Sequence, residues 1–471
     1  MLFNSFLFLI FFSVVTITYY AIHHKWRWLL LLIASCYFYA FLIPAYLLVL
    51  FLIITIDYAA GLLIESNQGR ARRLYLVMSI ISNLTVLGIF KYHNFFVENF
   101  NLLSGIFSFK TGSFSIWKLA LPIGLSFHTF QAMSYTIEVY KGREKAERKY
   151  GIYALYVMFY PQLVAGPIER PQHLIPQFYQ QHKVDYDGIT NGLKWMLWGF
   201  FMKVVVADRL GIYVDYVFKN VEVHSRLALI TAVFFYSFQI YCDFAGYSLI
   251  AIGSAKVMGF TLTKNFNRPY LASSLRNFWK RWNITLSQWF RDYVYFPMGG
   301  SRVTKSKYIF NILVVFILSG LWHGANWTFI LWGLIHGLFI LFGFLRHKFL
   351  PGFVISRFIG IVTTFLAVSF CWIFFRSQNL REAFIIIKRI FSAKTIQLIE
   401  GEFDERSLLV YSFLGIFTIV ATEMANEFYP GKFLLLQSPK EWVRLTTCIG
   451  LIIIILLFGV FDGSQFIYFQ F

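Results

Sequence analysis

Long apolar blocks separated by short, mostly basic loops dominate the chain. A transmembrane helix needs about 20 predominantly apolar residues, and many of the blocks approach that length. Predicted membrane segments lie at residues 1–22, 28–43, 45–63, 74–90, 119–137, 189–206, 227–260, 309–321, 327–345, 358–375, 408–421 and 445–461. Basic loops stay on the cytoplasmic side, so the groups at 24–27, 68–73 and 141–149 orient the spans and place the N-terminus outside. No short-period repeat and no soluble segment interrupts the pattern, which predicts a single membrane domain over residues 1–471.

One apolar block, residues 153–167, differs from a simple span. Pro161 and Gly166 interrupt it, and the charged residues Glu169 and Arg170 follow directly. Irregular backbone at membrane depth has to line a cavity or pack against protein. We therefore expect a re-entrant or buried segment here.

The stretch 272–297 shows two faces at helical spacing. The apolar face carries Phe278, Trp279, Trp282, Leu286, Trp289, Phe290 and Tyr293, and the polar face carries Arg276, Lys280, Asn283, Ser287 and Arg291. One hypothesis is a cytoplasmic interfacial helix that only rests on the membrane surface. The other is a functional helix, in which Lys280, Arg281 and Arg291 bind an anionic acyl donor and Asn283 faces the same way as the cations.

Composition assigns the chain to the membrane proteins. Of the 471 residues, 58% are hydrophobic and 14% are charged, and 56 are Phe, more than a soluble protein buries in its core. We expect an all-α polytopic membrane protein whose partner is the lipid bilayer. The net charge of +19 fits basic cytoplasmic loops and is weak evidence for nucleic acid, so no nucleic-acid partner is expected.

Cysteine usage indicates neither disulfides nor metal. Cys36, Cys242, Cys371 and Cys448 are scattered singly through apolar sequence, with no CxxC or Cys/His spacing. We predict that they are small core residues and that the chain has no metal site.

Polar residues inside apolar blocks are the candidates for chemistry, because burying them is costly unless they are paired or used. His323 and His336 lie within residues 309–345, predicted to be the helices that carry a catalytic histidine. They are 13 residues apart, about 20 Å along one continuous helix, so they need not share a site. Asp243 lies beside Gly246 and Ser248, where another helix can approach closely and the carboxylate can orient a histidine. For Asp57 and the other buried acids, hydrogen bonding between helices is the simpler interpretation.

A buried neutral histidine can take a proton from a hydroxyl that attacks an acyl carbonyl and return it to the leaving group. An asparagine can orient the imidazole or donate a hydrogen bond to the developing oxyanion. Buried histidine and aspartate also serve proton relays in transporters. The residues alone leave acyl transfer and transport as open alternatives.

Seven motifs resemble those of one family. They occur in the same order as in that family and extend over essentially the whole chain. They are PIGLSFHTFQAMSYTIEVYKG from Pro122, FYPQLVAGPIERP from Phe159, YCDFAGYSLIAIG from Tyr241, NFWKRWNITLSQWFRDYVYFPMGGSR from Asn277, SGLWHGANWTFILWGLIHG from Ser319, CWIFFRS from Cys371 and the C-terminal FIYFQF. The chain resembles the membrane-bound O-acyltransferase (MBOAT) superfamily, and within it the bacterial alginate O-acetylation group. The resemblance implies a ring of tilted transmembrane helices around a thin central wall, with a cytoplasmic and an extracytoplasmic funnel.

The resemblance also implies roles for individual residues. His323 matches the catalytic histidine of the superfamily, and Asn283 falls at its second active-site position. Bacterial relatives of the alginate type usually have histidine there, whereas many lipid-acylating members have asparagine. Asparagine can hydrogen-bond but cannot act as a base, so this departure leaves the role of the position open.

The function implied by the resemblance is acetyl transfer from cytoplasmic acetyl-CoA across a bacterial inner membrane to an exported polysaccharide such as alginate. No permanently bound cofactor is expected. Such proteins work with a separate extracytoplasmic partner resembling an SGNH hydrolase. Transfer of D-alanine to teichoic acid and O-acetylation of peptidoglycan are alternatives within the class, and a polysaccharide or proton-coupled transporter is the alternative outside it.

The aromatic tail at residues 462–471 follows the last predicted span and should reach the outer face. Aromatic runs are typical of the interfacial belt of membrane proteins. Tyr468 supplies the only strong nucleophile of the tail apart from the terminal carboxylate. We hypothesise that Tyr468 relays the acyl group as a covalent intermediate.

Overall fold

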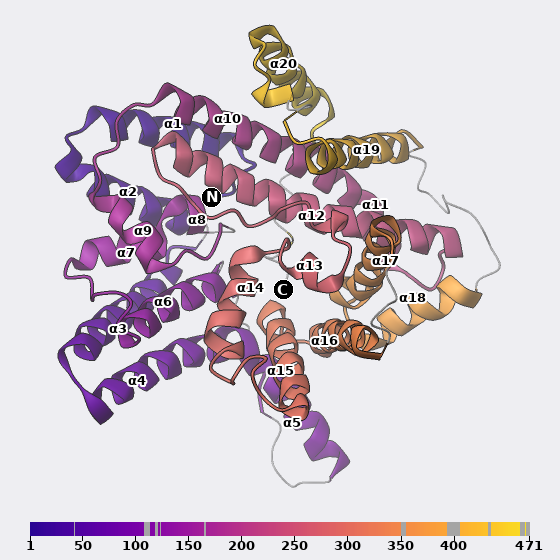
Figure 1. The fold of residues 1–471 in the computed structure, drawn as a ribbon, viewed down its shortest axis with the longest axis horizontal. Coiled ribbons are helices and arrows are strands. Elements are labelled where there is room, and N and C mark those ends of the chain that lie inside the picture. The colour runs from indigo at the N-terminus through magenta and orange to yellow at the C-terminus, as the bar shows by residue number, and fades with distance from the viewer. Residues whose placement is uncertain are drawn as a thin grey trace. The chain divides into compact units, whose positions relative to one another are not determined.

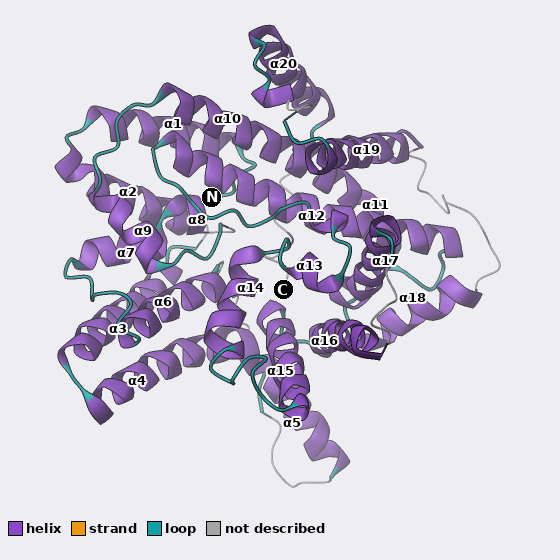
Figure 2. Cartoon of the chain, viewed as in Figure 1, coloured by secondary structure: helices purple, strands orange, loops and turns teal. Residues whose placement is uncertain are grey.

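The computed structural model describes residues 1–41, 43–107, 114–117, 121–122, 124–163, 166–349, 355–392, 406–431, 435–461 and 467. Every regular element among these residues is helical, and Figure 2 shows helices joined by loops with no strand in this part of the chain. The all-α prediction is confirmed. Contacts group the chain into two compact units, Met1–Gly192 with Ser254–Thr263, and Leu193–Gly253 with Lys264–Phe471.

Eight of the described helices are long and apolar enough to cross a membrane, which makes this a multi-pass membrane protein. These helices are Tyr46–Ser66, Gly69–Ile106, Arg226–Val257, Lys305–His323, Trp327–Arg346, Arg357–Arg376, Arg406–Phe428 and Glu441–Phe458. The predicted span at 119–137 differs, because the helix there begins only at Leu125. The first two predicted spans are short helices, of 16 and 17 residues.

The first unit contains nine α-helices among its described residues, before the chain enters α10 (Figure 1). They are α1 (Phe6–Ala21), α2 (His24–Ala40), α3 (Tyr46–Ser66), α4 (Gly69–Leu87, continued by the π-helix η1, Gly88–Tyr92), α5 (His93–Ile106), α6 (Leu125–Tyr140), α7 (Tyr150–Met158), α8 (Tyr160–Leu163) and α9 (Pro171–Tyr179). The short helices α7 and α8 replace the irregular apolar block, and their residues from Ile152 to Leu163 are all buried. The prediction of a segment packed within protein is confirmed.

Hydrogen bonds between α3, α4 and α6, which lie side by side in Figure 1, account for one buried acid. The Asp57 carboxylate is fully buried and accepts bonds from Ser79 Oγ at 2.6 Å and Asn83 Nδ2 at 2.8 Å. Ser79 Oγ also bonds Thr136 Oγ1 at 3.0 Å. The predicted interhelical role of Asp57 is confirmed.

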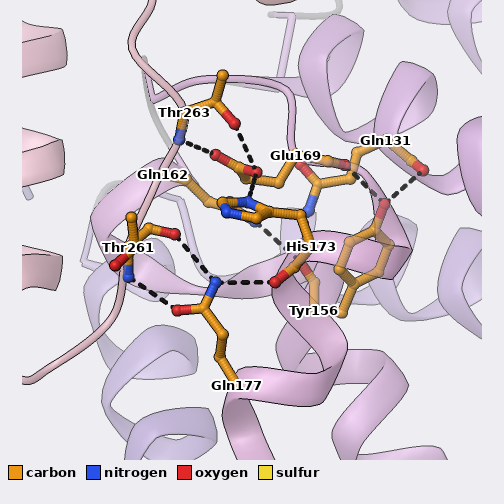
Figure 3. A network of polar contacts seen from close by, with 8 residues as sticks. All are labelled: Gln131, Tyr156, Gln162, Glu169, His173, Gln177, Thr261 and Thr263. Atoms are coloured by element: carbon orange, nitrogen blue, oxygen red, sulfur yellow. Dashed lines mark hydrogen bonds and ion pairs between the residues drawn. The ribbon is translucent and has the colours of Figure 1, made fainter.

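Glu169 organises a second polar network in this unit, drawn in Figure 3. Its buried carboxylate bonds His173 Nδ1 at 2.6 Å and accepts from the backbone amide and hydroxyl of Thr263. The bond to Glu169 raises the pKa of the half-exposed His173 above its usual value, although burial partly opposes this. Gln177 adds two bonds to the backbone of Thr261, at 3.0 and 2.8 Å. The FYPQLVAGPIERP motif therefore anchors the chain just before it enters residues 264–283.

The second unit contains the remaining described helices and the larger part of α10 (Tyr186–Phe200) and α12 (Arg226–Val257). The others are η2 (Phe201–Ala207), α11 (Asp208–Lys219), η3 (Pro269–Leu271), α13 (Leu275–Trp279), α14 (Ile284–Phe290), η4 (Arg291–Tyr295), α15 (Lys305–His323), α16 (Trp327–Phe349), α17 (Arg357–Arg376), α18 (Leu380–Ser392), α19 (Arg406–Phe428), η5 (Leu435–Gln437) and α20 (Glu441–Phe458). The closest pairing in this unit is between α15 and α16, which form a tight helical hairpin.

Two glycines allow the close contact of α15 and α16. A Cβ atom at Gly320 would lie 2.2 Å from the carbonyl oxygen of Phe329, and one at Gly333 would lie 2.2 Å from that of Phe316. Backbone therefore packs on backbone, as small residues permit in membrane helices. Because His323 is the last residue of α15, this contact fixes its position.

Replacing these glycines should loosen the hairpin. We expect Gly320→Ala or Gly333→Ala to destabilise the protein by about 1–3 kcal/mol, because the new methyl group meets a backbone carbonyl that cannot move aside. The measurement is the melting temperature of the purified full-length protein in detergent. Gly343→Ala is the control, since Gly343 lies on the same helix α16 and a methyl group added there would meet nothing within 4 Å. Equal melting temperatures for all three variants would contradict the packing argument.

Candidate functional site

His323 ends α15 in a pocket of aromatic rings. Its side chain is buried, at 3% exposure. The centroid of its ring lies 4.9 Å from that of Trp322, 5.1 Å from Trp332 and 5.3 Å from Phe375. Helix α15 ends at His323, and the chain turns over the next three residues. Asn326 Oδ1 then accepts the Thr328 amide at 3.0 Å, which stabilises the start of α16.

His336 lies on α16 and shares a neighbour with His323. Its ring centroid is 4.9 Å from that of Trp332 and 5.1 Å from that of Trp279. The side chain is fully buried, and neither ring nitrogen has a hydrogen-bond partner among the described residues. The two histidines are not on one continuous helix, because the chain turns after His323 and α16 packs along α15, so that Trp332 contacts both rings.

Asn283 occupies a break between two short helices. Its backbone adopts the left-handed conformation with φ of 41°, which asparagine tolerates better than most residues. The prediction of one interfacial helix over 272–297 is therefore wrong, since α13 ends at Trp279 and α14 begins at Ile284. The placement of Asn283 on the exposed basic face is wrong for the same reason, because its side chain is only 1% exposed.

The side-chain amide of Asn283 is buried but makes no hydrogen bond within the described residues. Neither Nδ2 nor Oδ1 has a hydrogen-bond partner among the described residues. Buried polar side chains are usually bonded, and an unbonded amide costs free energy that selection normally removes. An unpaired buried donor and acceptor on a strained backbone is typical of a site that binds a ligand.

A neighbouring segment fixes the break on both sides of Asn283. The Asn265 carbonyl accepts the Ile284 amide at 2.9 Å, and the Asn265 Oδ1 accepts the Thr285 hydroxyl at 2.9 Å. On the other side, the Asn267 amide donates to the Arg281 carbonyl at 2.9 Å. The backbone around Asn283 is therefore rigid although it is not helical.

Aromatic rings connect the Asn283 segment with His323. Trp282 packs on Trp372 with centroids 5.1 Å apart, and Trp372 stacks on Trp332 at 5.9 Å. All three tryptophans are almost fully buried. The aromatic stripe that the sequence assigns to a membrane surface is thus part of a packed core around both candidate residues.

The predicted donor-binding cations have different environments. Arg281 is committed to Glu427, with Nη2–Oε1 and Nη1–Oε2 distances of 3.0 and 3.2 Å. Lys280 is exposed. Arg291 is exposed, pairs with the adjacent Asp292 and lines a cavity of about 390 Å³ between α13, α14 and α15.

That cavity is lined both by basic residues and by residues close to the histidines. Arg276 and Arg291 line it, together with Trp279, which contacts His336, and Ser319, one turn before His323. Arg276 belongs to the polar face of the sequence pattern but was not among the predicted donor-binding residues. The pattern at helical spacing was the signal that identifies it.

Asp243 bonds a lysine and a backbone amide, and no contact with a histidine is seen among the described residues. Its Oδ1 lies 2.7 Å from Lys203 Nζ, and its Oδ2 accepts the Ile467 amide at 2.7 Å. Lys203 is 1% exposed and also pairs with Asp208 at 2.6 Å. The geometry gives Asp243 a structural contact in place of the predicted orientation of a histidine. Sequence analysis missed Lys203, although a lysine within the apolar run FMKVVV is itself a sign of a buried ion pair.

The described residues near the C-terminus bond to η2, α11 and α12. Arg209 Nη2 donates to the Phe458 carbonyl at 2.6 Å, and the Val460 amide donates to the Val204 carbonyl at 2.8 Å. Ile467 follows with its bond to Asp243. Tyr468, the predicted relay residue, lies outside the described residues.

Comparison with known proteins identifies the family of the chain. The profile of the MBOAT family, the membrane-bound O-acyltransferases, matches residues 16–381. The probable alginate O-acetylase of Pseudomonas aeruginosa is 38% identical over 412 residues, covering 84% of this chain and 76% of that protein. The peptidoglycan O-acetyltransferase of Helicobacter pylori is 32% identical over 491 residues, covering 94% and 91%. The teichoic acid D-alanyltransferase of Bacillus subtilis is 29% identical over 272 residues, covering 54% and 69%. The chain is therefore a member of the membrane-bound O-acyltransferase family.

Proposed function

We propose that this membrane O-acyltransferase takes an acetyl group from cytoplasmic acetyl-CoA and passes it across a bacterial inner membrane for O-acetylation of an exported polysaccharide. The observation that carries the proposal is the buried, unpaired amide of Asn283 in a rigid break, joined by packed tryptophans to the buried His323. An alginate-like polymer is favoured as the acceptor, because the relative named as an alginate O-acetylase is the more similar of the two acetyltransferases compared above.

His323 serves as the general base in this proposal. The acceptor hydroxyl attacks the thioester carbonyl, its proton passes to the imidazole, and a new C–O bond forms. The C–S bond then breaks, and the imidazolium returns the proton to the departing thiolate, which leaves as free coenzyme A. Asn283 Nδ2 donates to the oxygen that becomes negative in the tetrahedral intermediate.

Donor binding is assigned to the cavity lined by Arg276 and Arg291. Its volume of about 390 Å³ can hold part of an acetyl-CoA molecule, and guanidinium groups are well matched to the phosphates of coenzyme A. Lys280 is exposed and available to the same ligand, whereas Arg281 already bonds Glu427.

The proposal includes a relay across the membrane through the C-terminal residue Tyr468. Asp243 holds the Ile467 amide, directly before Tyr468 in the sequence. In the proposal Tyr468 is the first acceptor, and its acetyl ester passes the group to a hydroxyl of an extracytoplasmic SGNH-hydrolase-like partner, which regenerates the phenol. The partner then acetylates the polymer.

Removal of His323 tests the enzymatic assignment. His323→Ala should lower acetyl transfer by about 100- to 10,000-fold, because a general base is lost, and membrane insertion should stay normal. Acetyl-CoA hydrolysis by the purified protein and polymer acetylation in cells are the measurements. A transporter needs no such base, so wild-type polymer acetylation by this variant would overturn the proposal. His336→Ala, on the other side of Trp332, should be milder, and an equally inactive, well-expressed His336 variant would reverse our ranking of the two.

The Asn283→Gly variant separates the contribution of the side-chain amide from that of the left-handed backbone. Glycine accepts the left-handed conformation without strain, so this variant should fold normally yet lose about 100- to 1,000-fold in turnover if the amide stabilises the oxyanion. Asn283→His should retain appreciable activity, since imidazole also donates a hydrogen bond. A fully active Asn283→Gly variant would show that only the backbone turn matters.

Tyr468→Phe removes a single hydroxyl and keeps the ring. We expect lost polymer acetylation with normal membrane insertion, and an acetyl adduct on the C-terminal peptide of the wild-type protein by mass spectrometry. Normal acetylation by the phenylalanine variant would reject the relay and leave the tail as a membrane anchor.

A further inference from the structure

A second, larger cavity lies in the second unit, away from the histidine pair. Its volume is about 730 Å³, within the range of pockets that bind small molecules. Tyr241, Ala245, Ser248, Leu249 and Ile252 line it from one face of α12. Residues of α10, α19, α20 and the segment after Lys264 complete the wall.

Helix α20 forms the outer side of this cavity and packs only weakly on the protein. Only 6% of its apolar stretch is buried, and its single buried residue, Leu451, lines the cavity. The outer face of such a helix contacts lipid. The space beneath it is bordered by apolar side chains such as Trp198, Leu249 and Ile252, which suit a hydrocarbon chain.

One part of the wall is basic. Lys194, Lys264 and Arg268 line the cavity against a single carboxylate, Glu423, which bonds the Tyr241 hydroxyl. The three cations come from α10 and from the segment that follows the first unit's last residue.

The basic charge exceeds what neighbouring carboxylates neutralise. Glu427 is shared by three guanidinium groups, from Arg268 at 3.0 Å, Arg281 at 3.0 Å and Arg357 at 2.8 Å. One carboxylate for three cations leaves positive charge beside the cavity even after pairing. Such a group attracts anionic headgroups at a membrane surface.

Two buried polar atoms of the wall have no bond within the described residues. They are Ser248 Oγ, in a residue 2% exposed, and Asn265 Nδ2, in a residue 1% exposed. Buried donors without a partner point to a polar ligand group, because leaving them unsatisfied is costly. Asn265 also bonds Thr285 through its Oδ1, so the wall of the cavity is part of the support for Asn283.

We propose that this cavity binds one anionic phospholipid, with the phosphate at Lys194 and Lys264 and an acyl chain between α12 and α20. The apolar side chains suit a hydrocarbon chain, and the excess of cations suits an anion, so a phospholipid matches both. The proposal is independent of the acetyl transfer proposed above, since none of the cavity residues is assigned to the reaction.

The test is lipid binding by the full-length protein in detergent micelles. Fluorescently labelled phosphatidylglycerol should bind saturably, and phosphatidylcholine should compete poorly. The double variant Lys194→Gln, Lys264→Gln should bind phosphatidylglycerol about tenfold more weakly, because two headgroup contacts are lost. Lys440→Gln is the control, since this exposed lysine lies before α20 and outside the cavity wall.

A second variant tests the apolar part of the cavity wall. Ala245→Leu places a larger side chain in the cavity and should reduce binding while the basic residues stay intact. Wild-type lipid affinity in both the double lysine variant and a well-folded Ala245→Leu variant would overturn the proposal. Displacement of the labelled lipid by inorganic phosphate would assign the site to a free anion, and displacement by coenzyme A would assign it to the acyl donor. Either result would also overturn it.

Discussion

The free-energy cost of burying polar groups among apolar side chains governs this structure. Most of the buried charges are compensated at short distance. Asp57 has two side-chain donors from α4, Glu169 has His173 and Thr263, and Lys203 lies between two carboxylates. Removing one partner from such a cluster would leave an uncompensated buried charge, which is far more destabilising than loss of a surface ion pair. These clusters therefore fix helices to one another and leave little freedom for chemistry.

Asn283 and His336 are among the buried residues that lack such compensation. Each is buried, and each has polar side-chain atoms with no partner among the described residues. These unbonded polar atoms, rather than burial alone, make the residues around Trp332 a candidate site for a ligand, as Ser248 and Asn265 do for the larger cavity. His323 packs on the same tryptophan as His336, and the rings of Trp332, Trp372 and Trp282 connect it to the segment that carries Asn283.

Hydrophobic patterning was sufficient for the membrane class, for most of the long helices and for the buried segment near Pro161. It failed at residues 272–297, because periodicity describes a continuous helix and contains no signal for one residue in the left-handed conformation. Patterning also could not show that Arg281 is paired rather than available to a donor, because its partner Glu427 is 146 residues away in the sequence. Patterning did place a break after His323, since the predicted segments 309–321 and 327–345 are separate, but it could not show that the two helices pack together and bring both histidines to Trp332. His323 and Asn283, which were matched through motifs, are both buried in one unit and are linked through packed rings, while their roles stay predictions.

The break at Asn283 also links the site to structure further away. Its backbone depends on Asn265, whose side chain lines the larger cavity with one atom and holds Thr285 with another. A ligand that bonds Asn265 Nδ2 would favour the side-chain orientation that supports the break, and the two sites would then be coupled by their shared residue. Because such coupling is reciprocal, a donor that requires the intact break would in turn strengthen binding in the cavity. The non-helical turn that carries the Asn283 amide is thus supported by a residue that also lines the larger cavity.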